Sequence, residues 1–114
     1  MSPGLRRHQR HQLDRKVWLS WDNQGHVRQV ICKGLDISIS GIRVSCSEPL
    51  PTRDLVQFRI QGTAFAGTGS VRSCAHARMM YVIGIEFGQG VRWDPTRFPL
   101  AEPIPAKGDV ILAR

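Results

Sequence analysis

The chain has 114 residues, of which 41% are hydrophobic, and its 16 basic residues exceed its nine acidic residues to give a net charge of +7. This length and composition predict one folded domain and exclude a large multidomain enzyme and a wholly disordered chain. The longest nearly apolar run, Met79 to Ile85, is far shorter than the roughly 20 residues of a membrane-spanning helix, and three cysteines without C-x-x-C spacing do not predict a secreted disulfide scaffold.

Basic residues gather at the start of the chain, where the first 16 positions hold five of them against one acidic residue, a net charge of +4. They are Arg6, Arg7, Arg10, Arg15 and Lys16. Because this segment has few apolar side chains to bury, we expect residues 1–16 to form a flexible basic arm. Two interpretations remain open: a solvated terminal tail, or an arm that becomes ordered around an anionic partner.

Six segments after the arm have the alternation or the β-branched and aromatic content that favours strands. They are residues 17–21, 27–36, 41–46, 55–60, 65–71 and 81–87. No stretch of ten or more residues shows a helical stripe, and turn-forming residues separate the segments. The pattern predicts an all-β fold, a six-stranded antiparallel β-barrel over residues 17–92, with Gly67 and Gly69 marking a bulge or a barrel corner.

Residues 93–114 contain four of the seven prolines and are expected to form an extended Pro-rich C-terminal tail that straps over the barrel. Within this tail, the apolar residues 110–112 could pair at a sheet edge.

Two short motifs contain the residues that could bind a ligand. Arg6 and Arg10 form an R-x-x-x-R in the arm, and Asp36, Ser38 and Gly41 form a D-x-S-x-x-G between two predicted strands. Taken singly, the arginines could be solvated charges, the aspartate and the serine could cap a turn, and the glycine could be a turn residue. Their joint occurrence in this order instead favours a ligand site.

On these two motifs the sequence resembles the PilZ domain family, small bacterial β-barrels that bind the second messenger cyclic di-GMP. Family members carry R-x-x-x-R in a flexible N-terminal segment and D/N-x-S-x-x-G after the second strand. The segment 81–87 also resembles the last barrel strand of the family. The resemblance covers roughly residues 5–90, and it implies a non-catalytic cyclic di-GMP receptor.

The residue types fit that ligand, which has two guanines and two phosphates. An arginine fork matches the O6 and N7 acceptors of guanine, binds phosphate and stacks on bases, and Asp36 can accept from the N1–H and N2–H₂ donors of guanine. Ser38 can donate and accept, and Gly41 either adopts a positive φ or lets the ligand approach the backbone. Arg7 could reach a phosphate from the same arm, and Arg72 could stack on a guanine.

We expect binding to order the arm and so relay the signal to an unidentified downstream protein. The alternative is a small basic barrel that binds RNA or DNA, although the charge lies mainly on the arm rather than on a sheet face. With no export signal and a bacterial ligand, a cytoplasmic location is expected.

Neither the histidines nor the cysteines show metal-ligand spacing, so we expect no metal, no further cofactor and no catalytic residue. The three cysteines, at positions 32, 46 and 74, are expected to be small core residues suited to a reducing compartment. The tryptophans are expected in the core or at its rim.

Overall fold

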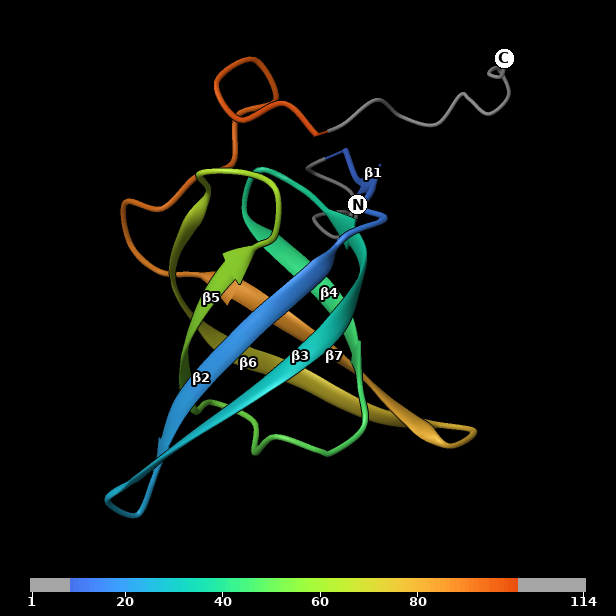
Figure 1. Cartoon of the computed structure of the whole chain (residues 1–114), viewed down its shortest axis with the longest axis vertical. Helices are drawn as coiled ribbons and strands as arrows, with labels where there is room; N and C mark the ends of the chain where they lie inside the picture. Colours follow the sequence, from blue (N-terminus) through green and yellow to red (C-terminus); the bar gives the residue numbers. More distant parts are fainter. Residues whose placement is uncertain (1–8, 101–114) are drawn as a thin grey trace, which may run out of the picture.

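The strands of the chain pair into one antiparallel sheet that closes on itself as a barrel (Figure 1). A computed structural model describes residues 9–100, in which there are seven strands and no helix. The strands are β1 (His11–Gln12), β2 (Lys16–Asn23), β3 (His26–Ile37), β4 (Gly41–Cys46), β5 (Leu55–Ile60), β6 (Ala66–Ala77) and β7 (Met80–Phe87). Their order is β1-β3-β2-β5-β6-β7-β4, and the additional β3–β4 pairing closes the barrel. The six-stranded antiparallel barrel is therefore confirmed, with β1 as an extra strand.

Apolar and polar residues alternate along the strands, so the apolar face of the sheet lies inside the barrel. In β5, for example, Val56, Phe58 and Ile60 are buried while the residues between them are exposed. At one end of the core, the rings of Phe58, Phe65 and Phe87 contact one another at centroid distances of 5.1–5.4 Å. The described residues hold no helix that is long and apolar enough to cross a membrane.

The second half of the predicted arm is packed on the barrel. Leu13 is only 1% exposed and belongs to the core, and its N–H donates to the carbonyl of Leu35 at 3.1 Å. Gly34 makes this crossing possible, because a Cβ there would lie 2.6 Å from Leu13 Cδ2 and 2.8 Å from the carbonyl oxygen of Arg15. No residue near Leu13 in the sequence predicts this packing, since it depends on a glycine in β3, the strand that pairs with both β1 and β2. Residues 1–8 lie outside the described part of the chain.

The first residues of the predicted tail are also part of the core. Trp93 is 2% exposed, and its indole Nε1–H donates to the carbonyl of Phe98 at 3.1 Å. The Phe98 ring lies 5.0 Å from that of Phe65. Residues 93–98 therefore fold back in a turn and cover one end of the barrel instead of running on as an extended strap.

Gly67 and Gly69 in β6 do not form a bulge, which was one of the two expectations for them. The register shift between β6 and β7 falls between Val71 and Ser73, beyond the position expected for the bulge. A Cβ on Gly69 would lie 2.6 Å from the carbonyl oxygen of Glu86, so this glycine permits close strand contact. Gly67 lies under the side chain of Val91.

Two of the three cysteines are core residues as expected, but they form a disulfide, which the expectation of a reducing compartment did not include. Cys32 on β3 and Cys46 on β4 are buried and joined by a disulfide, with Cα atoms 4.8 Å apart. They face each other because the neighbouring pair, Lys33 and Ser45, is in register across the two strands. Their spacing of 14 residues gives no signal until the strand pairing is known. Cys74 is the free cysteine.

Candidate ligand-binding site

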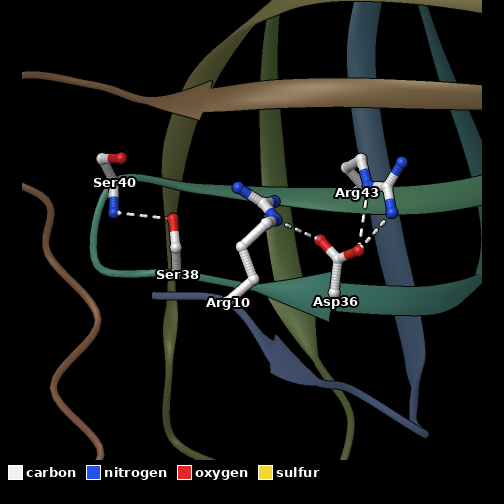
Figure 2. Close-up of polar contacts among 5 residues, drawn as sticks. All are labelled: Arg10, Asp36, Ser38, Ser40 and Arg43. Atoms are coloured by element: carbon white, nitrogen blue, oxygen red, sulfur yellow. Dashed lines mark hydrogen bonds and ion pairs between the residues drawn. The ribbon is translucent and has the colours of Figure 1, made fainter. Parts of the chain in front are cut away.

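The two motifs meet at the edge where β1 pairs with the end of β3. This pairing places Gln12 opposite Asp36, so that Arg10, two residues earlier, reaches the carboxylate. Arg10 Nε donates to Asp36 Oδ1 at 2.6 Å across a separation of 26 positions in the sequence (Figure 2). The register of a two-residue strand thus brings the arm and the loop motif together.

Arg43 is a member of this cluster that the sequence interpretation missed. It lies opposite Asp36 in the β3–β4 pairing, and its Nε and Nη2 both donate to Asp36 Oδ2, at 2.9 and 2.5 Å. Figure 2 shows the carboxylate held between the two guanidinium groups. The available signal was the short loop between Ile37 and Gly41, which makes the residues flanking it cross-strand neighbours.

Asp36 is ionised at neutral pH. Its side chain is only 15% exposed, and this burial raises its pKa, but hydrogen bonds and charge from Arg43 and Arg10 outweigh the burial and hold the pKa below the usual 3.8. The same carboxylate raises the pKa of Arg43. Arg10 donates from Nε, and its two Nη groups make no hydrogen bond to any residue in 9–100. The cluster therefore presents an oriented guanidinium with free donors.

Ser38 and Gly41 shape the loop that carries Asp36. Ser38 is fully buried, its Oγ accepts from the N–H of Ser40 at 3.3 Å, and its own N–H donates to the carbonyl of Gly41 at 2.8 Å (Figure 2). Gly41 does not have a positive φ. A Cβ there would lie 2.7 Å from the carbonyl oxygen of Ile85, so the glycine lets the loop pack against β7. The expectation of a positive φ for Gly41 is therefore wrong, while close approach of a ligand stays a prediction.

The remaining predicted residues are placed as follows. Arg6 and Arg7 lie outside the described residues. Arg72 pairs through Nη1 with Glu86 on the neighbouring strand β7. Glu86 is the residue opposite Gly41 in the β4–β7 register, so strand β7 lies between Arg72 on β6 and the loop motif.

One surface cavity of the described residues adjoins the motifs. A cavity of about 530 Å³ is lined by Gln9, His11, Ile39, Arg92, Trp93, Asp94 and Pro95. Gln9 directly precedes Arg10, and Ile39 lies within the D-x-S-x-x-G loop. A larger cavity of about 1020 Å³ on β2, β3, β5 and β6 is lined by no residue of either motif. The smaller cavity is therefore the one that belongs to the candidate site.

Comparison with known proteins agrees with this placement. A family model described as PilZ domain matches residues 5–94, a range that contains both motifs and residues 92–94 of the cavity wall. No curated protein shows a significant match to the chain.

Proposed function

Because the chain belongs to the PilZ domain family, whose members in general bind cyclic di-GMP, we propose that it is a non-catalytic cyclic di-GMP receptor that relays the ligand signal to a partner protein. The observation that carries this proposal is the 2.6 Å contact between Arg10 and Asp36, which joins the two motifs in one cluster. The ligand is a second messenger of the bacterial cytoplasm, and the proposal places the protein there.

Within the proposed site, Arg10 binds the ligand through its free Nη groups. A guanidinium fork suits either the O6 and N7 edge of a guanine or a phosphate. Both oxygens of Asp36 already accept hydrogen bonds, from Arg10 and Arg43, and the hydroxyl of Ser38 is buried in the loop. Asp36 and Ser38 therefore act mainly by positioning, which differs from the direct contacts that the residue types suggested.

In this proposal, the N-terminal arm passes the ligand signal to the partner protein. Arg6 and Arg7, four and three positions before Arg10, add cationic groups for the phosphates. Leu13 anchors the arm in the core, so the ordering step that we propose concerns residues that precede this anchor. The surface formed when the arm closes on the ligand is what the partner recognises.

Titration calorimetry with cyclic di-GMP tests the proposal. We expect saturable binding, weakened at least about tenfold in Arg10→Ala and in Arg6→Ala, because each charge-assisted contact contributes about 1.5–3 kcal/mol. Ser38→Ala should weaken binding less than either arginine change. Arg78→Gln is the matched control, because Arg78 lies in the β6–β7 turn, which projects from the barrel away from β1 (Figure 1). Absence of binding, or an Arg10→Ala variant that binds like the wild type, would overturn the proposal.

The second candidate, binding of single-stranded RNA or DNA, has one observation in its favour. Trp18 is 44% exposed beside the larger cavity, and the Arg59 guanidinium lies 5.7 Å from its ring centroid. An aromatic ring with an arginine is the kind of platform on which bases stack. Binding of oligonucleotides with steep salt dependence, together with no heat from cyclic di-GMP, would favour this candidate.

A further inference from the structure

The cavity beside the motifs has a third wall, residues 92–95, that neither motif includes. Its volume of about 530 Å³ lies in the range of small-molecule sites. Because Gln9 and Ile39 line it together with Arg92 and Asp94, a ligand that contacts the motif cluster can extend directly into this cavity.

The third wall is held in place by its buried centre. The Trp93 N–H donates to the carbonyl of Ile39 at 3.2 Å, which ties the wall to the loop motif. On the arm side, the His11 ring lies edge-on to the Trp93 ring at 5.0 Å. Arg92 and Asp94, on either side of this anchor, both line the cavity and are exposed. Two opposite charges are thus presented from a fixed backbone.

Both charged groups keep hydrogen-bonding capacity for a ligand. Asp94 Oδ1 accepts from the N–H and the hydroxyl of Thr96, at 2.9 and 2.7 Å, and these bonds lower the pKa of Asp94, so it is ionised at neutral pH. The N–H and the charge of Arg97 also act on this carboxylate and lower its pKa, but no hydrogen bond to Oδ2 lies within ordinary distance limits among the described residues. Arg92 makes no hydrogen bond or ion pair within residues 9–100. Within the described part of the chain, the cavity therefore offers one carboxylate oxygen and one guanidinium with hydrogen-bonding capacity.

We infer that this cavity takes one guanine base of cyclic di-GMP, with Arg92 bound to O6 and N7 and Asp94 accepting from N1–H and N2–H₂. The inference rests on the proposed function and names the part of the site that selects the base. Guanine has this pair of donors beside O6, whereas adenine places the unprotonated N1 at the position that would face the carboxylate. Ile39 and Pro95 provide apolar contact for the base.

The charges suit the rest of the ligand as well. The motif cluster and the cavity wall together contribute Arg10, Arg43 and Arg92 against Asp36 and Asp94, a net charge of +1 from three positive and two negative groups. With one guanine bound in the cavity, Arg10 is available for the other guanine or for a phosphate.

The test is calorimetric titration of the full chain with cyclic di-GMP and with cyclic di-AMP. Arg92→Gln should weaken cyclic di-GMP binding at least about tenfold. Asp94→Asn keeps the oxygen that caps Thr96 but replaces the free acceptor, and it should lower the preference for cyclic di-GMP over cyclic di-AMP at least about tenfold. Arg78→Gln is the charge-matched control and should bind like the wild type. Melting temperatures check that each variant is folded, and the backbone amide resonance of Trp93 should shift when the wild type is saturated.

The outcomes separate this inference from the proposed function. If the wild type binds, Arg10→Ala abolishes binding, and both Arg92→Gln and Asp94→Asn bind like the wild type, the cavity takes no base and the inference fails while the receptor function stands. If the wild type binds neither dinucleotide, the proposed function fails and the inference with it.

Discussion

Replacing Asp36 by asparagine tests the two ion pairs that Asp36 forms with Arg10 and Arg43. The change keeps the shape of the side chain, removes its charge, and replaces one acceptor oxygen with an amino group that faces an arginine. Two ion pairs are lost, to Arg10 and Arg43, and both arginines are largely solvent-exposed. Each exposed pair contributes about 0.2–1 kcal/mol, so we expect the two pairs together to contribute about 0.4–2 kcal/mol at neutral pH. For a domain of this size, 1 kcal/mol corresponds to about 4–8 °C, so that loss lowers the melting temperature by about 2–16 °C.

The loss depends on pH in a direction that follows from the pKa of Asp36. The folded-state pKa is lower than the unfolded-state pKa, so the carboxylate stabilises the fold fully above the unfolded value of about 3.9. This contribution disappears as the pH falls through the lower, folded-state pKa. The difference between wild type and Asp36→Asn should therefore be largest near neutral pH and shrink below about pH 4.

Thermal unfolding of both proteins between about pH 3 and pH 7 measures this difference. Glu48→Gln is the control, because it breaks a single pair, Arg28 Nη2 to Glu48 Oε1 at 2.9 Å, and should cost less than about 1 kcal/mol. A difference between wild type and Asp36→Asn that is the same at both ends of the pH range would refute the ion-pair explanation. So would a cost no larger than that of Glu48→Gln.

Two further predictions concern the loop and the disulfide. Gly41→Ala places a Cβ about 2.7 Å from the carbonyl oxygen of Ile85 and should cost about 1–3 kcal/mol in urea unfolding; a neutral result would contradict the close packing of the loop. Reducing the Cys32–Cys46 bond should lower the free energy of unfolding by about 3 kcal/mol. Thiol titration of the denatured protein should rise from one to three thiols on reduction, and three thiols in the oxidised sample would contradict the pairing.

Much of the fold could be predicted because apolar and polar residues alternate along the strands. The segments 41–46 and 55–60 match β4 and β5 residue for residue, and 81–87 falls one residue short of β7. Side chains on a strand alternate between its two faces, so a few neighbouring residues suffice to show which face is buried.

The parts that could not be predicted all depend on strand register. The core position of Leu13 depends on the missing side chain of Gly34, and the pairing of Cys32 with Cys46 depends on the alignment of β3 with β4. The short loop between Ile37 and Gly41 indicates that Arg43 lies near Asp36, but the pairing itself depends on which residue faces Arg43 across the hairpin.

The sequence by itself determined a six-stranded β pattern and the chemical character of two motifs, because periodicity and side-chain type are properties of neighbouring residues. Only the tertiary structure decided that Arg10 reaches Asp36, that Arg43 also contacts Asp36, and that residues 92–95 line a cavity beside the two motifs. The physical reason is closure of the barrel: hydrogen-bond register between distant strands, which no short segment contains, fixes which side chains become neighbours.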